Sequence, residues 1–166
     1  MTIQQKTVLR WVLYSLLGLI AILLQTTVFS LARPFGLQLY LVPTLAACIA
    51  MREKTEHAAL YALLLSLFWC LFGADCGSLT IVTLTAASVL CAVACEAFLV
   101  RGLLSALLLS LFSLLLVEGS VFAARLYLGT LTAGLFLTVF LPAVGLSLLF
   151  YPLFYWLTGR IAKVGA

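Results

Sequence analysis

Charged residues are scarce in this sequence. Asp, Glu, Lys and Arg make up only 8% of the 166 residues, while hydrophobic residues make up 66%. Soluble domains carry roughly a quarter of their residues as charges, so this composition excludes an ordinary water-soluble protein. The few charges stand in short clusters between long apolar stretches, which is the pattern of membrane-spanning helices. We therefore expect a protein embedded in a lipid bilayer.

Groups able to carry out catalysis are also few. The only histidine, His57, lies in the polar segment Met51–His57, which we interpret as a solvated loop. The five cysteines lack the close doublets of a zinc site, and Cys91 and Cys95 are expected to pack as small apolar residues. There is no phosphate-binding glycine loop and no nucleophilic serine elbow. The sequence therefore predicts a non-enzymatic protein without cofactor or metal ion.

The apolar stretches divide a single transmembrane domain, residues 1–166, into six predicted spans. A helix rises about 1.5 Å per residue and must cross about 30 Å of hydrocarbon, which takes roughly 20 mostly apolar residues. The second span is short, so we expect either that residues 30–36 dip into the membrane or that the bilayer thins there. The six predicted spans are residues 11–31, 37–51, 57–74, 78–100, 103–124 and 132–158.

Basic residues are distributed unequally between the two sides of this arrangement. Seven lie on the side of the two termini, and only Arg33 and Arg125 lie on the other. Cytoplasmic loops carry an excess of Lys and Arg, so both termini are predicted to be cytoplasmic. The seven are Lys6, Arg10, Arg52, Lys54, Arg101, Arg160 and Lys163.

Acidic residues at or near membrane depth are candidate contacts. Glu96 and Glu118 lie inside predicted spans, where a charge is costly and suggests a role. Glu96 is close enough to Arg101 to pair at the interface, and Glu118 shares roughly one helix face with Arg125. Both remain open to two interpretations, a partly hydrated interfacial side chain or a contact with another helix or partner. Asp75 lies in the outer loop before the fourth span, where either Asp75 or Ser78 is suited to capping the next helix.

Small residues and prolines mark further positions. Ala46 and Ala58 each begin a small-xxx-small pair that allows close helix approach, and we expect both to face lipid and contact a partner helix. Pro142 and Pro152 each remove a backbone donor from the last span, which should bend or divide there. Ser147 is a candidate to bond the backbone freed near the second proline.

The order of several motifs resembles a known family. Gln25-Thr26-Thr27 stands late in the first span, and Pro43-Thr44-Leu45 stands in the second, followed by a basic turn. The third span ends in Gly73-Ala74-Asp75, and the proline-containing last span ends near Arg160. Together with the chain length, this order resembles the MreD family of bacterial rod-shape-determining membrane proteins over nearly the whole chain.

The resemblance implies a fold, a location and partners. The implied fold is similar to that of the S components of energy-coupling-factor transporters, and the implied location is the bacterial cytoplasmic membrane. The implied role is a scaffold of cell elongation and peptidoglycan synthesis beside the bitopic protein MreC. MreB and RodA with a penicillin-binding protein are further implied partners. Membrane lipids are also expected to contact the chain, whereas nucleic acid is not.

Two functions from different classes remain open. The first is the non-catalytic membrane scaffold, and the second is a vitamin-binding S component of the same six-helix shape. An S component needs a polar pocket near its outer side, for which only Asp75, Glu118, Arg125 and a few hydroxyls are available. S components also commonly have an Ala-x-x-x-Ala face in the first span, which residues 11–31 lack. These features favour the scaffold.

Overall fold

A computed structural model describes residues 3–32, 39–72, 77–98, 102–130, 134 and 136–164 of the chain. All regular elements in these ranges are helices, which confirms the predicted all-α class. Two of them, η1 and η3, are short π-helical segments, in which the backbone is wound more widely than in an α-helix. In chain order the elements are α1 (Ile3–Leu23), η1 (Leu24–Val28), α2 (Phe29–Ala32), α3 (Val42–Ala50), α4 (Thr55–Leu71), α5 (Gly77–Ala97), α6 (Leu103–Tyr127), η3 (Phe136–Phe140), α7 (Leu141–Leu148) and α8 (Tyr151–Val164).

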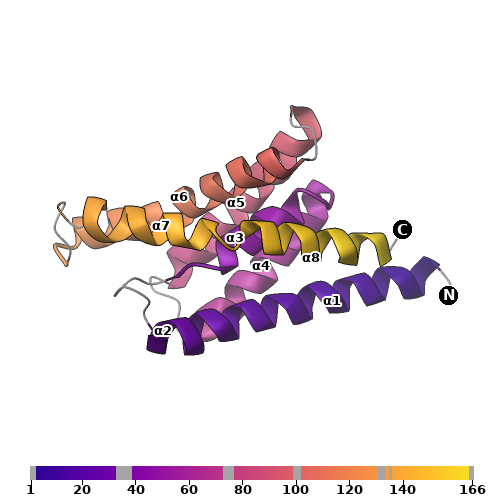
Figure 1. Ribbon diagram of the computed structural model, residues 1–166, viewed down its shortest axis with the longest axis horizontal. Coiled ribbons are helices and arrows are strands. Elements are labelled where there is room, and N and C mark those ends of the chain that lie inside the picture. The colour runs from indigo at the N-terminus through magenta and orange to yellow at the C-terminus, as the bar shows by residue number, and fades with distance from the viewer. Residues whose placement is uncertain are drawn as a thin grey trace.

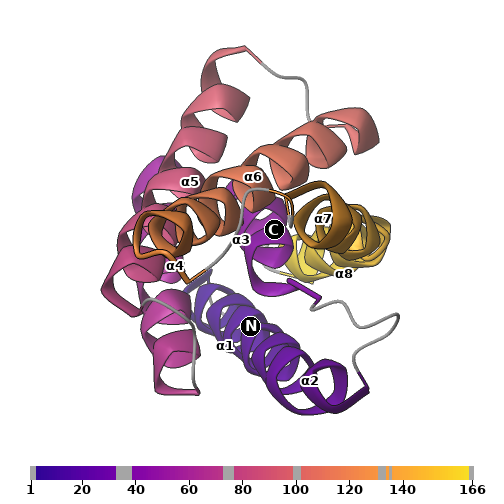
Figure 2. The same ribbon diagram turned by 90° about the vertical axis from the view of Figure 1, so that its left-hand side faces the viewer.

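The helices form an elongated bundle around the short helix α3 (Figure 1 and Figure 2). Helices α1, α4, α5, α6 and α8 all contact α3, and every residue of α3 is buried. Its 9 residues measure about 14 Å at 1.5 Å per residue, which is less than half the thickness of a bilayer core. Helix α3 is therefore the internal element on which the longer helices pack.

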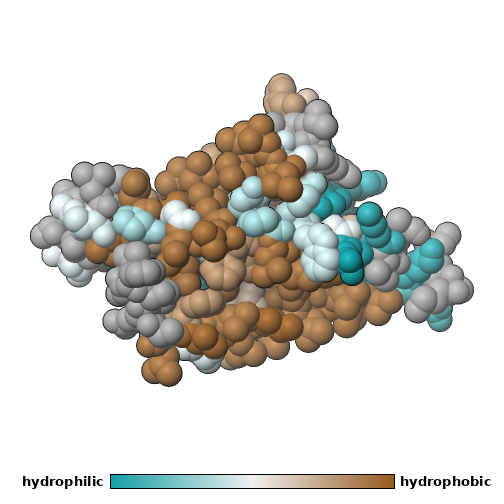
Figure 3. Space-filling model, in the orientation of Figure 1, coloured by the Kyte–Doolittle hydropathy of each residue, from teal (hydrophilic) through white to brown (hydrophobic). Residues whose placement is uncertain are grey.

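The longer helices have the dimensions and surface of membrane spans. Residues 5–28, 77–97, 103–127 and 138–163 are each long and apolar enough to cross a bilayer. Apolar residues cover the middle of the face shown in Figure 3, and hydrophilic residues gather at one end. Helix α1 begins and α8 ends at that same end, which we call the terminal end (Figure 1). The chain is therefore a multi-pass helical membrane protein.

The second predicted span differs from the structure at its start. The expectation of a helix over 37–51 is wrong for residues 39–41, which are not helical, and α3 begins only at Val42. Pro43 stands in the first turn of α3, where its missing N–H leaves no helical hydrogen bond unmade. Residues 33–36 of the segment expected to dip into the membrane lie outside the described residues.

Of the other spans, the third, fourth and fifth agree with α4, α5 and α6 within three residues at each end, whereas the last continues past its predicted end at 158 to Val164. The first begins earlier than predicted, at Ile3, and is interrupted by η1. The division predicted in the last span is confirmed, because α7 and α8 are separated at residues 149–150, just before Pro152. Ser147, expected to bond the backbone freed by that proline, instead donates to the Ala143 carbonyl at 2.7 Å.

Candidate functional site

The start of α3 is held by the side chain of Gln25. This residue lies in η1 and is only 2% exposed. Its Oε1 accepts hydrogen bonds from the backbone N–H groups of Leu41 at 2.8 Å and Val42 at 3.0 Å. The first N–H groups of a helix have no partner within the helix, so the amide supplies the acceptor that they would otherwise lack in an apolar interior. The contact thus joins the Gln25-Thr26-Thr27 motif to the residues just before the Pro43-Thr44-Leu45 motif.

Two further hydrogen bonds attach the same end of α3 to other helices. Ser113 of α6 donates through Oγ to the Pro43 carbonyl at 3.1 Å. The backbone N–H of Tyr40 donates to Ser147 Oγ of α7 at 2.8 Å. Both serines are fully buried, and each bond satisfies a polar group where water is excluded. The start of α3 is thus fixed to η1, α6 and α7 at once.

The other end of α3 leads into a cluster of three charged residues, Arg10, Arg52 and Glu53, and the tyrosine Tyr14, which we call the Arg10–Glu53 cluster. Arg10 Nη2 lies 3.4 Å from Glu53 Oε2, and Glu53 is only 6% exposed. The interpretation of Met51–His57 as a solvated loop is therefore wrong for Glu53, while His57 is exposed as expected. A charge is costly to remove from water unless an opposite charge compensates it, so the buried Glu53 carboxylate depends on Arg10.

Arg52 connects this cluster to α8. Its Nη2 donates to the Tyr155 carbonyl at 3.0 Å, and its Nε donates to Thr158 Oγ1 at 3.3 Å. The guanidinium also lies 4.6 Å from the centre of the Tyr155 ring, a cation–π distance. A Cβ atom at Gly159 would lie 2.8 Å from Arg52 Nη2, so glycine is the residue that leaves room for the arginine. The loop after α3 thereby joins α1 to α8.

In the described part of the chain, four buried side-chain nitrogen or oxygen atoms make no hydrogen bond, and three of them belong to the Arg10–Glu53 cluster. These atoms are Arg10 Nε, Tyr14 Oη and Glu53 Oε1, and the fourth is Ser88 Oγ on α5. Native proteins leave few such atoms unsatisfied, so their concentration in one cluster marks it as the most polar point of the interior.

Helices α1 and α4 approach closely next to this cluster. A Cβ atom at Gly18 would lie 2.6 Å from Tyr61 Oη and 2.7 Å from Leu65 Cδ1, distances that the packing does not permit. The Tyr61 hydroxyl donates to the Tyr14 carbonyl at 2.7 Å. Glycine at position 18 thus allows the tyrosine of α4 to lie directly over the α1 backbone.

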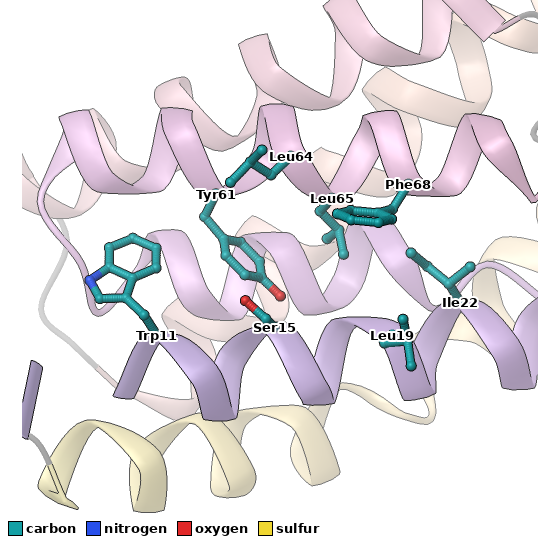
Figure 4. Close-up of a pocket in the computed structure, with 8 residues that line it drawn as sticks. All are labelled: Trp11, Ser15, Leu19, Ile22, Tyr61, Leu64, Leu65 and Phe68. Carbon is teal, nitrogen blue, oxygen red and sulfur yellow. The ribbon is translucent and has the colours of Figure 1, made fainter. Parts of the chain in front are cut away.

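An apolar cleft between α1 and α4 is lined by four residues of each helix (Figure 4). Its volume is about 140 Å³. Two of its lining residues, Ser15 and Tyr61, carry a hydroxyl, and the other six present apolar or aromatic surface. These six are Trp11, Leu19, Ile22, Leu64, Leu65 and Phe68.

Of the acidic residues singled out in the sequence, Glu96 makes a contact between two helices. Glu96 at the end of α5 accepts hydrogen bonds from Thr55 at the start of α4, from the backbone N at 3.2 Å and from Oγ1 at 3.0 Å. It therefore serves as an interhelical cap for α4. Asp75 lies outside the described residues, as does Arg101, the partner expected for Glu96. The structure thus assigns Glu96 a structural contact between neighbouring helices.

Glu118 is buried in α6 at 6% exposure, and Arg125 is half-buried about two turns later on the same helix. The expectation that Ala46 and Ala58 face lipid is wrong, because each is only 2% exposed. Ala46 packs in the central core beside α1 residues, and Ala58 packs against α3, α5 and α6 residues. Both are interhelical contacts, so neither is available to a partner in the bilayer.

Sequence reasoning did not single out Gln25, Arg52 or Glu53 as internal contacts. A glutamine inside an apolar span was a usable signal, because its amide must find partners away from water. For Arg52 and Glu53 no such signal existed, since a charged turn between two spans is normally solvated. Glu53 is buried and Arg52 half-buried because the short helix α3 draws the turn into the bundle.

No cluster of three or more potential metal ligands occurs among the residues that the structure describes. The Arg10–Glu53 cluster offers one carboxylate and two guanidinium groups, which suits charge pairing rather than proton transfer to a substrate. Comparison of the chain with protein-family models, with curated proteins and with solved structures finds no match.

Proposed function

We propose that this chain is a non-catalytic scaffold of the bacterial cell-elongation machinery, embedded in the cytoplasmic membrane as partner of an MreC-like bitopic protein. The observation that carries the proposal is that buried and half-buried polar side chains contact other parts of the same chain. Gln25, Arg52, Glu53, Ser113 and Ser147 bond or pair with other helices and loops of the same chain. Such bonds rigidify a bundle, which a scaffold needs in order to hold partners in register.

The proposal includes six passes with both termini in the cytoplasm. In this arrangement α3, although short, serves as the second pass. The basic residues of the terminal end would then face the cytoplasm, in keeping with the excess of Lys and Arg on that side of membrane proteins. MreB and RodA with a penicillin-binding protein are proposed as further members of the assembly.

The cleft between α1 and α4 weighs against the alternative of a vitamin-binding S component. A site for a hydrophilic vitamin requires several convergent polar groups to orient its ligand. The cleft offers the Ser15 hydroxyl, because the Tyr61 hydroxyl already donates to Tyr14. It also extends to Trp11, toward the start of α1 and the terminal end, whereas the S-component hypothesis places the pocket near the outer side (Figure 4).

Co-purification of the full chain in mild detergent tests this function. We expect an MreC-like bitopic protein to be recovered with the tagged chain in amounts near one to one. The Glu53→Lys variant is the negative control. It breaks the Arg10–Glu53 pair, so the bundle should lose its native packing and the bitopic protein should no longer be recovered. Recovery of an ATPase module and a bound vitamin, with no bitopic protein, would refute the scaffold and support the S component.

A further inference from the structure

We propose that the cleft between α1 and α4 binds one acyl chain of an anionic phospholipid, with the head group against the basic residues of the terminal end. The inference goes beyond the scaffold role and does not rest on it. It requires only that these helices lie in a bilayer, where phospholipid is the surrounding solvent.

The size and lining of the cleft suit a hydrocarbon chain. An apolar protein cavity of about 150 Å³ stays dry and accepts a molecule the size of benzene, and this cleft has about 140 Å³. Its lining is apolar except for Ser15 and Tyr61, and the Tyr61 hydroxyl is already bonded to the Tyr14 carbonyl. A segment of an acyl chain fills such a space, whereas water or a polar ligand would lack partners there.

The same dimensions argue against a helix as the occupant. A helix with its side chains is about 10–12 Å wide, and a standard protein interface covers about 800 Å² per partner. The narrow cleft admits a chain of methylene groups between Leu19 and Phe68, which lie on opposite sides of it (Figure 4). A partner helix would have to cover the outer faces of α1 and α4 instead of entering between them.

Aromatic residues mark the interfacial end of the cleft. Trp11 lines it at the end nearest the start of α1, opposite the end formed by Ile22 and Phe68 (Figure 4). The Trp11 ring lies 5.6 Å from the ring of His57, in the first turn of α4. Tryptophan prefers the depth of the lipid head groups, so an acyl chain in the cleft would carry its head group just beyond Trp11.

Charge at this end favours an anionic head group. Lys6 and Arg10 precede Trp11 on α1, and Lys54 immediately precedes α4. The described residues of the terminal end comprise six basic and three acidic side chains, a balance of +3. The basic residues are Lys6, Arg10, Arg52, Lys54, Arg160 and Lys163, and the acidic ones are Glu53, Glu56 and Glu96. Juxtamembrane basic clusters attract anionic lipids, whereas a zwitterionic head group gains little from them.

Native mass spectrometry of the full chain in mild detergent tests the site. The probes are dioleoyl phosphatidylglycerol and dioleoyl phosphatidylcholine, which carry the same acyl chains and differ in charge. We expect one phosphatidylglycerol to be retained per chain under conditions that remove phosphatidylcholine. Lys6→Gln and Lys54→Gln should each weaken retention roughly fivefold, the effect of one basic residue near an anionic surface. Lys163→Gln, on α8 at the same end, should change it much less.

The same substitution at two positions of α1, one inside the cleft and one outside it, tests the cleft itself. Leu19→Trp places a bulky ring in the cleft and should abolish selective retention, whereas Leu16→Trp, on the exposed surface outside it, should not. If Leu19→Trp does not fold, as judged by size-exclusion profile and helical circular dichroism, Ser15→Leu fills the same space with a smaller side chain. Equal retention of the two lipids, or equal loss in the Leu16 and Leu19 variants, would show surface lipid only and overturn the proposal. Loss of a co-purified protein from the Leu19 variant, with lipid retention unchanged, would instead assign the cleft to a protein partner.

Discussion

Arg10 in the first helix and Glu53 in the turn after α3 form an ion pair at 3.4 Å, and the Glu53 side chain is almost wholly buried. The pair joins two elements that lie more than forty residues apart in the chain, close to the hydrophilic end of the bundle. Removing Arg10 would leave the buried Glu53 charge uncompensated, whereas Arg10 itself is partly exposed.

Replacing Arg10 with Met should lower the free energy of unfolding by about 3 kcal/mol, because Glu53 then remains buried without its partner. The double variant Arg10→Met, Glu53→Gln should cost less than the single one, since the orphaned charge is removed as well. Unfolding in mixed detergent micelles measures both. Lys54→Met is the control, because Lys54 is exposed and its loss should change stability by no more than about 0.5 kcal/mol. Equal effects of the Arg10 and Lys54 substitutions would contradict the importance of the pair.

Replacing Gln25 with Leu should loosen the start of α3. The N–H groups of Leu41 and Val42 lose their acceptor in a buried site, at a cost of about 1–3 kcal/mol for the stranded donors. Hydrogen exchange at these two amides should accelerate relative to amides in the middle of α6. Thr27→Val, also in η1 but exposed, should leave the exchange unchanged. Unaltered protection in the Gln25 variant would show that the amide cap is dispensable.

Gly18→Ala and Gly145→Ala should have opposite effects on stability. The added methyl group at position 18 collides with Tyr61 and Leu65, so we expect a loss of about 1–3 kcal/mol. At position 145 the methyl group meets nothing within 4 Å, and the better helix propensity of alanine should stabilise α7 by up to about 1 kcal/mol. The Gly18→Ala, Tyr61→Phe double variant should recover part of the loss. Thermal unfolding in detergent measures each, and similar effects at the two glycines would refute the close approach.

Substitution of small residues should separate folding from partner binding. Ala46→Leu overfills the core around α3 and should reduce the yield of folded protein. Gly145→Leu adds a side chain to an exposed position of α7, so the fold should persist while any partner helix packed on that face is displaced. Co-purification of the bitopic partner, normalised to folded chain, distinguishes the two. Normal partner recovery with Gly145→Leu would exclude this face of α7 as the contact.

Single cysteines in a background without the native ones should report the sidedness of the chain. We expect Lys54→Cys and Lys163→Cys to be labelled from the cytoplasm, and Tyr127→Cys, at the far end of α6, from outside. The positive charge of the terminal end is the physical basis for this orientation. Labelling of positions 54 and 127 from one side would mean that α4, α5 and α6 cross the membrane an even number of times.

The extent of the long helices was predictable from residue order because it depends on local properties. Apolar runs bounded by charges define α4, α5 and α6 within a few residues, since every backbone polar group in a bilayer must bond within its own helix. The division before Pro152 was predictable for the same reason, because the missing donor and the ring clash are properties of that residue alone. The sequence correctly indicated close helix packing at Ala46 and Ala58, but it did not indicate that both face the interior of the bundle instead of lipid.

What the sequence determined by itself is a helical membrane protein with its charges collected at the ends of apolar helices. Its scarcity of charge indicates a bilayer, and apolar runs of roughly 20 residues have the length of helices that satisfy their own backbone hydrogen bonds there. Only the tertiary structure decided that α3 is a short buried core, that Glu53 leaves water to meet Arg10, and that Gln25 caps α3. These contacts join residues far apart in the chain, and no local pattern specifies which distant group will be present to pay for removing a polar side chain from water.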